Sequence, residues 1–180
     1  MTKSYYSNGK LLITGEYGVL DGALSLAIPT KYGQLLTVEK NDTKYLNWKS
    51  IDDQGNIWFE GEFDLNNNKS ITNSDSLTAD TLLKILSEAK KLNPKFLSNS
   101  TGYIVSTILD FPKNWGLGSS STLINNIAQW ANVDPFKLLW NAFSGSGYDI
   151  ACAIHKTPIL YQLVDKNPII KPVTFNPSFK

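Results

Sequence analysis

The sequence contains no arginine, since all 17 of its basic residues are lysines. Any phosphate group that this protein binds must therefore be held by lysine ammonium groups, backbone N–H groups and helix dipoles, without the bidentate contacts of a guanidinium. An A+T-rich genome would produce the same preference for lysine. Cysteine and histidine occur once each, as Cys152 and His155. These counts exclude an internal disulfide and a Cys/His metal cluster.

Long apolar runs are also missing, because no stretch approaches 18 apolar residues. Gly9, Lys10 and Glu16 interrupt what would be the apolar core of an export signal, so we expect a cytoplasmic protein with no membrane partner. The 17 basic and 16 acidic residues are interspersed and leave a formal charge of +1, which gives a nucleic-acid partner no electrostatic support. The oligomeric state cannot be deduced from these features.

What the chain does contain is ample apolar material: 42% of its 180 residues are hydrophobic and 12% are aromatic. This is enough for a packed core in one sizeable domain or two small ones, and no repeat or linker divides the chain. Alternation and turn residues predict strands within 4–39, a hairpin in 44–65, and strands at 101–111, 148–154 and 159–164.

Three segments have helical spacing or helix-start signals: 77–92, 123–131 and 134–143. Residues 66–75 are polar and predict a surface loop, and 166–180 show no clear element. The fold class predicted is α+β, with a β-sheet layer packed against helices.

The stretch PKNWGLGSSST (112–122) lies between a predicted strand and a predicted helix. Gly116 and Gly118 allow positive φ angles and a close approach to a ligand, and backbone N–H groups can converge there at the positive end of the helix dipole. Such a loop suits a triphosphate. The alternative is that the serines only cap the helix. It is not a Walker A loop, because no lysine follows the second glycine.

Two further glycine-rich stretches carry charged residues. In NGKLLITGEYGVLDG (8–22), Lys10 and Glu16 stand in an apolar context that makes their burial unfavourable without partners, and the alternative is that both are exposed at loop tips. In SGSGYD (144–149), Asp149 is expected to open a strand after a tight turn, where its carboxylate could face a cleft. The alternative for Asp149 is ordinary turn chemistry.

Taken together and in this order, the three stretches resemble the motifs of the GHMP kinase superfamily, which includes galactokinase, homoserine kinase, mevalonate kinase and phosphomevalonate kinase. The first is similar to PGKxxLxGEHxVxxG, the second to the phosphate loop PxxxGLGSSAA, and the third to the SGxD segment. The similarity spans nearly the whole chain and is closest in character to mevalonate or phosphomevalonate kinase.

The resemblance implies a kinase that transfers the γ-phosphoryl group of ATP, with Mg²⁺, to a small-molecule acceptor such as mevalonate or phosphomevalonate. Lys10 would lie beside the acceptor oxygen and Asp149 would take its proton. Ser120 would contact Mg²⁺, and Glu16 would support the nucleotide side of the site. The residues implied to wrap the ATP phosphates are Gly116, Leu117, Gly118, Ser119, Ser120 and Ser121.

The resemblance also implies that residues 1–180 form the N-terminal ATP-binding domain of such a kinase, by precedent with a left-handed βαβ unit, and that the C-terminal domain is absent from this chain. Ser121 and Thr122 replace the small alanines that are usual in the family. The helix predicted at 134–143 lacks the glutamate that helps to hold Mg²⁺ in mevalonate kinases. Two alternatives stay open: a non-catalytic nucleotide- or metabolite-binding module or inactive relative, and a structural domain that binds no nucleotide.

Overall fold

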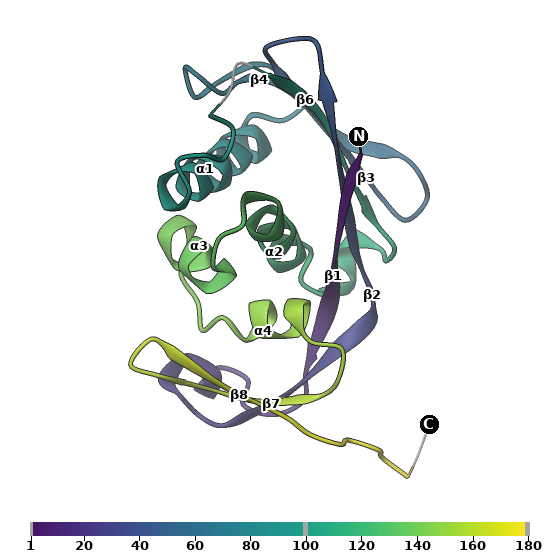
Figure 1. Cartoon of the computed structure of the whole chain (residues 1–180). Coiled ribbons are helices and arrows are strands. Elements are labelled where there is room, and N and C mark those ends of the chain that lie inside the picture. The colour runs from purple at the N-terminus through teal and green to yellow at the C-terminus, as the bar shows by residue number, and fades with distance from the viewer. Residues whose placement is uncertain (1, 99–100, 179–180) are drawn as a thin grey trace.

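Eight strands form one mixed sheet in the part of the chain that the computed structural model describes, residues 2–98 and 101–178 (Figure 1). Across the sheet the order is β5-β4-β3-β6-β2-β7-β8, and β1 pairs with β2 outside this path. The strands are β1 (Lys3–Leu12), β2 (Ser25–Asn41), β3 (Leu46–Ile51), β4 (Ile57–Asp64), β5 (Lys69–Asn73), β6 (Gly102–Leu109), β7 (Ile159–Val164) and β8 (Asn167–Pro172).

The long strand β2 connects the two parts of the sheet. It pairs with β1 along most of its length, with β6 through its second half and with β7 at its first residues, in each case antiparallel. β3 and β6 pair in parallel, and the connection between them contains β4, β5 and α1. The predicted hairpin at 44–65 is confirmed as the antiparallel pair of β3 and β4.

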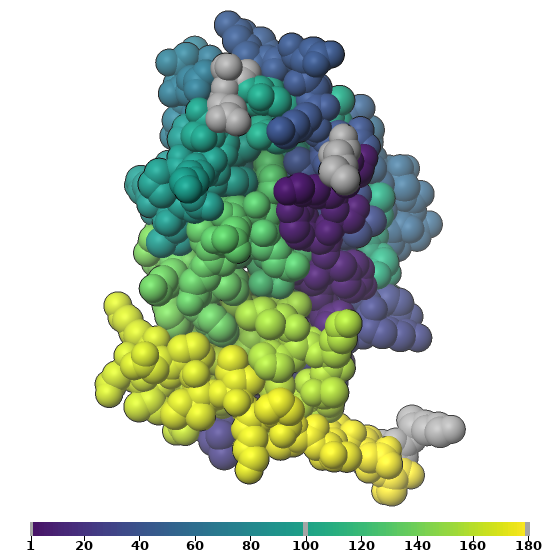
Figure 2. All heavy atoms as spheres, in the orientation of Figure 1, coloured from purple at the N-terminus to yellow at the C-terminus, as the bar shows by residue number. Residues whose placement is uncertain are grey.

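The helices lie together on one face of the sheet (Figure 1). They are α1 (Ser76–Leu92), α2 (Ser119–Ala131), α3 (Pro135–Ala142) and α4 (Tyr148–Ile154), with short 3₁₀ turns η1 (Gly18–Asp21) and η2 (Lys113–Trp115). The larger core lies between α1, α2, α3 and the sheet, and a smaller cluster around Cys152 and Tyr161 lies between α4 and β7. In Figure 2 the yellow β7–β8 hairpin covers one end of the molecule. The predicted α+β class is therefore confirmed.

Helix ends follow the sequence signals. Asp75 caps α1 by accepting a hydrogen bond from the Thr78 N–H group at 2.7 Å, and α1 ends at Leu92 with Asn93 as its C-cap, before Pro94. Asp134 caps α3 in the same way, with Pro135 in the first turn. No helix in residues 2–98 and 101–178 is long and apolar enough to cross a membrane.

Three predictions about secondary structure are wrong. Residues 148–154 form helix α4 instead of a strand, because a short apolar run has no decisive period and here Ile150–Ala153 are all buried. The expected loop at 66–75 contains β5, and the unassigned tail contains β8. Both lie at edges of the sheet, where exposed polar residues and the prolines of β8 are tolerated because one side of an edge strand needs no hydrogen bonds.

Candidate active site

The glycine-rich loop joins β6 to α2, as the sequence predicted. Gly116 has a φ of 71° and Gly118 a φ of 85°, both in the left-handed region that favours glycine. The side chain of Leu117 is buried against Leu109 and Phe111. Leu117 therefore anchors the loop to the sheet, and only its backbone is available to a ligand.

The first turn of α2 has no side-chain cap. Its N-cap residue is Gly118, and the first hydrogen bond along the helix runs from the Thr122 N–H group to the Gly118 carbonyl at 3.0 Å. Ser119, Ser120 and Ser121 are helical residues of that turn, so the alternative in which the serines cap the helix is wrong. The N–H groups of this turn have no partner within the helix, and together with the helix dipole they can attract an anion.

Lys10 lies directly beside this loop, although it stands 107 positions before Leu117 in the chain. Its backbone N–H group donates to the Leu117 carbonyl at 3.0 Å. A Cβ atom on Gly118 would lie 3.2 Å from Cγ of Lys10, so the lysine stem runs along the Gly118 backbone. Gly9 permits this approach, because a Cβ atom there would lie 2.9 Å from the Leu117 carbonyl oxygen. Lys10 is half-buried, so it is not the exposed loop-tip residue of the alternative interpretation.

Asp149 is the second residue of α4 and reaches the first turn of α2. One carboxylate oxygen, Oδ2, accepts a hydrogen bond from the Ser121 hydroxyl at 3.2 Å. The other, Oδ1, is buried and has no hydrogen-bond partner among the described residues. A buried carboxylate oxygen without a donor is unfavourable, so this atom is available to a ligand hydroxyl or a cation.

The two hydroxyls that replace family alanines both have partners. Ser121 holds Asp149, and the Thr122 hydroxyl donates to Oε1 of Gln34 on β2 at 3.0 Å. Below them, buried amides of α2 join the sheet: Asn126 donates to the Gln34 carbonyl at 2.9 Å and accepts from the Ser7 hydroxyl at 2.7 Å. The start of α2 is thus fixed to β1, β2 and α4.

The electrostatic surroundings of Cys152 include both predicted catalytic charges, those of Asp149 and Lys10. Burial, its largest cause, raises the pKa of the Cys152 thiol to about 12. The negative charge of Asp149 adds to the rise and the positive charge of Lys10 opposes it. Cys152 lies one helical turn after Asp149, so both charges act on the same end of α4.

Glu16 is exposed in the turn before η1, between Gly15 and Tyr17, which both have positive φ. It lines neither of the cavities beside the first turn of α2. Its negative charge contributes, after burial and Asp149, to raising the pKa of Tyr148 above its usual value. The resemblance implied that Glu16 supports the nucleotide side of the site, and this stays a prediction.

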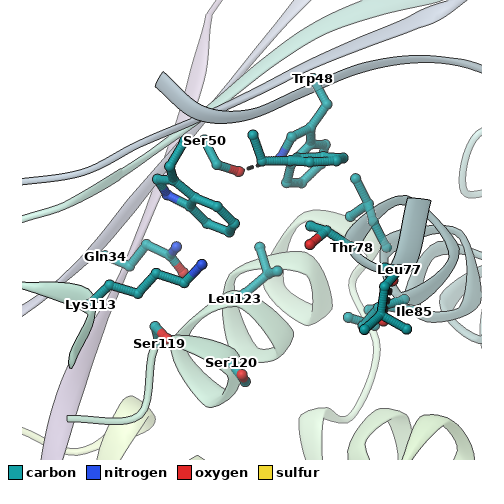
Figure 3. Close-up of a pocket in the computed structure, with 14 residues that line it drawn as sticks. Gln34, Trp48, Ser50, Leu77, Thr78, Ile85, Lys113, Ser119, Ser120 and Leu123 are labelled. Atoms are coloured by element: carbon teal, nitrogen blue, oxygen red, sulfur yellow. Dashed lines mark hydrogen bonds between the residues drawn. The ribbon is translucent and has the colours of Figure 1, made fainter. Parts of the chain in front are cut away.

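A cavity of about 270 Å³ opens on one side of the first turn of α2, and we call it the indole cavity. In Figure 3, Ser119 and Ser120 lie on one side of it and Trp48 and Ser50 on the opposite side, with Gln34 and Lys113 next to one another on the flank. Its lining residues are Gln34, Trp48, Ser50, Trp58, Phe59, Leu77, Thr78, Thr81, Leu82, Ile85, Lys113, Ser119, Ser120 and Leu123.

The indole cavity combines flat rings with polar groups. Nζ of Lys113 lies 3.5 Å from the centroid of the Trp58 ring, and Nε1 of Trp58 is buried without a partner among the described residues. Sequence reasoning missed Lys113, Trp48 and Trp58 as residues of this site. Lys113 stands inside the loop motif and could have been noticed there, but nothing local indicated that Trp48 and Trp58 face the same loop.

A second cavity, of about 330 Å³, lies on the other side of the same turn, and we call it the aspartate cavity. Ser120, Leu123, Thr81 and Ile85 line both cavities, so the first turn of α2 and one side of α1 stand between them. The lining residues of the aspartate cavity are Thr81, Ile85, Ser120, Ser121, Leu123, Ile124, Leu139, Phe143, Ser144 and Asp149.

A metal ion would find few protein ligands here. The described residues contain no group of three or more His, Cys, Asp and Glu side chains able to hold a metal. Mg²⁺, however, usually binds through one or two protein oxygens together with substrate phosphates and water. The Ser120 hydroxyl, which lines both cavities, can serve as such an oxygen.

Comparison with solved structures identifies the fold of this chain. No family model matches the chain, and no curated protein matches it by sequence. Among solved structures, galactokinase from Lactococcus lactis, in complex with galactose, matches 97% of this chain and 48% of its own, with a TM-score of 0.71 and 16% identity. The chain has the fold of the GHMP kinase N-terminal domain.

Two other GHMP kinases agree with this assignment. Mevalonate kinase from Methanococcus jannaschii matches 97% of this chain and 56% of its own, with a TM-score of 0.68 and 11% identity. Phosphomevalonate kinase from Streptococcus pneumoniae, solved with phosphomevalonate and AMPPNP, matches 91% and 50%, with a TM-score of 0.64 and 19% identity. This chain therefore spans about half the length of the GHMP kinases that it matches.

Proposed function

We propose that this chain is the ATP-binding half of a GHMP-type small-molecule kinase. The observation that carries the proposal is the convergence of three distant segments: the uncapped first turn of α2, the Lys10 side chain along Gly118, and Asp149 held by Ser121. A phosphoryl-transfer site needs amide and cationic groups around the phosphates and a proton acceptor beside them. These segments supply all of these groups within one site.

The indole cavity suits the nucleoside part of ATP. The half-buried ring of Trp58 offers flat apolar surface for a base, and the Gln34, Thr78 and Thr81 side chains offer polar groups at its edge. A base bound there would leave the phosphates directed to Ser119 and Ser120, which line the same cavity.

The phosphates would lie on the first turn of α2. The N–H groups between Gly116 and Ser121 and the helix dipole favour negative charge at this point, and Lys10 adds a full positive charge. Because the chain has no arginine, the protein's own contribution to binding the phosphates must come from lysine and backbone groups.

Mg²⁺ would be held by the Ser120 hydroxyl together with phosphate oxygens and water, and it would neutralise charge on the transferred group. Asp149 is the proposed base. As the acceptor oxygen bonds to the γ-phosphorus, the bond from that phosphorus to the bridging oxygen breaks and ADP leaves with the electron pair. The acceptor proton passes to Oδ1 of Asp149, the oxygen that Ser121 does not occupy.

The acceptor would enter through the aspartate cavity, between Asp149 and the start of α2. Its proposed class is a small metabolite alcohol or phosphate such as mevalonate or phosphomevalonate, acted on in the cytoplasm. The chain spans about half of the matched kinases, so we propose that a second domain completes the acceptor pocket and excludes water during transfer.

The first experiment measures nucleotide binding. MgATP should raise the melting temperature of the wild-type chain, because a ligand that binds only the native state stabilises it by mass action. Ser120→Ala should reduce this protection, whereas Ser4→Ala, at an exposed position of β1, should leave it unchanged. If MgATP has no effect on the wild-type chain, the structural-domain alternative is supported and our proposal is wrong.

The second experiment measures transfer in an ADP-release assay with a panel of acceptor alcohols and phosphates. Asp149→Ala should lower kcat by on the order of 100-fold or more while ATP affinity stays within about twofold. Asp149→Asn keeps the side-chain shape and should be equally impaired, since an amide cannot accept the proton. ATP binding without transfer in the wild-type chain would favour a non-catalytic nucleotide-binding module, and unchanged turnover in both variants would remove Asp149 from the mechanism.

A further inference from the structure

The ring of Tyr148 faces the ammonium group of Lys10, a contact that the proposed reaction does not by itself require. Nζ of Lys10 lies 5.4 Å from the centroid of the Tyr148 ring, within the range of a cation–π interaction. We propose that Tyr148 is a positioning residue, which holds the Lys10 ammonium group beside the first turn of α2. This inference rests on the proposed function only for its effect on the reaction rate.

The remainder of Lys10 is already fixed by the phosphate loop. Its N–H group donates to the Leu117 carbonyl at 3.0 Å, and a Cβ atom on Gly118 would lie 3.2 Å from its Cγ and 3.4 Å from its Cε. The stem therefore has one path, along the backbone of Gly118. Only the end of the side chain is left to be oriented, and the Tyr148 ring is at that end.

Among residues 2–98 and 101–178, no carboxylate orients the Lys10 ammonium group through an ion pair. The single ion pair within 4.0 Å there joins Lys91 and Glu88. A carboxylate in direct contact would neutralise Lys10 and compete with a phosphate for it. The face of a ring orients the ammonium group and leaves its full charge for an incoming anion.

Tyr148 is itself held firmly enough to act as a support. Its ring packs on the cluster of Ile159, Tyr161 and neighbouring residues. The loop before it is anchored twice, because the Tyr161 hydroxyl donates to the Ser146 carbonyl and Nε1 of Trp140 donates to the Gly145 carbonyl at 3.1 Å. Such anchoring limits the movement of the ring and hence of the group that it orients.

The aromatic face, and not the hydroxyl, should be the active part of Tyr148. Burial and the charges of Asp149 and Glu16 raise the pKa of Tyr148, so its ring stays uncharged at physiological pH. A phenylalanine presents the same face, whereas a leucine fills similar space without a π-system. Tyr148→Phe and Tyr148→Leu therefore form a matched pair.

The placement can be tested by NMR without any activity, in the full chain with ¹³Cε-labelled lysine. The signal of Lys10, identified by its loss in Lys10→Met, should be shifted upfield by the ring current. It should stay shifted in Tyr148→Phe and return to the ordinary lysine position in Tyr148→Leu. The signal of Lys44, which lies 5.2 Å from the Tyr45 ring centroid, should not move in either variant and reports that the fold is intact. An unshifted Lys10 signal in the wild type, or no change in Tyr148→Leu, overturns the proposal.

The effect on catalysis is tested in the same ADP-release assay. Tyr148→Leu should lower kcat roughly tenfold, because losing a partly desolvated cation–π contact costs about that factor in rate. KM for ATP should change little. Tyr148→Phe, which keeps the ring, should have the wild-type rate. A Tyr148→Leu enzyme with wild-type kcat overturns the positioning role. If the wild-type chain transfers phosphate to no acceptor, the proposed function fails, and the Lys10 signal alone then decides whether Tyr148 holds Lys10.

Discussion

The close approach of β1 to the phosphate loop depends on the missing side chain of Gly9, and Gly9→Ala should disrupt it. A Cβ atom at this position would lie 2.7 Å from Oγ1 of Thr30, 2.9 Å from the Leu117 carbonyl oxygen and 3.1 Å from the Tyr32 carbonyl oxygen. Two of these atoms belong to the backbone, so they cannot rotate away. β1 and the loop must therefore separate.

The magnitude follows from the two consequences of that separation. Inserting a methyl group into a fully packed position costs about 1–3 kcal/mol. Weakening the hydrogen bond from the Lys10 N–H group to Leu117, now 3.0 Å long, adds about 0.5–1.5 kcal/mol. We expect Gly9→Ala to lose about 2–4 kcal/mol of unfolding free energy, which for a chain of this size lowers Tm by about 4–16 °C.

The assay is urea unfolding of the ligand-free chain, followed by tryptophan fluorescence. Gly55→Ala is the control: Gly55 has a φ of 85°, and a Cβ atom there would meet nothing within 4 Å, so only backbone strain of about 1–2 kcal/mol is expected. The reasoning is refuted if Gly9→Ala loses no more stability than Gly55→Ala. The reasoning is supported if Gly9→Ala loses clearly more unfolding free energy than Gly55→Ala.

The remaining predictions concern three single residues: Thr122, Cys152 and Lys113. Thr122→Val leaves Oε1 of the buried Gln34 without its donor, and urea unfolding should show a loss of about 1–3 kcal/mol. With its pKa raised to about 12, the Cys152 thiol should be alkylated at pH 8 roughly a thousandfold more slowly in the native chain than in urea. Because the native state binds this proton more tightly, the stability due to Cys152 should be complete below about pH 9 and decline as the pH approaches 12, as unfolding at several pH values would show. Lys113→Met removes the charge 3.5 Å from the Trp58 ring and should change the fluorescence of that indole with less than about 1 kcal/mol of destabilisation.

Much of the candidate site could be predicted from local patterns. The strand, the glycine turn and the helix around Gly118 are consecutive in the chain, and their signals depend on residues a few positions apart. Positive φ at Gly116 and Gly118 follows from the same turn. The convergence of Lys10 and Asp149 on this loop was implied only by the resemblance of three motifs, since no periodicity connects segments so far apart.

Other features depended on packing and had no local signal. The run after Gly147 forms a helix in which four consecutive residues, 150–153, are buried, so neither a helical nor a strand period was visible in the sequence. β5 and β8 were missed because an edge strand needs only one hydrogen-bonding partner and tolerates polar residues and proline. The partners of Ser121 and Thr122 lie on α4 and β2, which local analysis cannot bring together.

The sequence by itself determined where the chain turns, which segments are amphipathic and where the phosphate loop needs glycines with positive φ, because these properties arise from the residue and its nearest neighbours. The tertiary structure alone decided that Asp149 starts a helix, that one of its oxygens is held while the other stays free, and that Tyr148 faces Lys10. These features depend on contacts between residues 28 to 138 positions apart, which form only when the sheet and helices pack together.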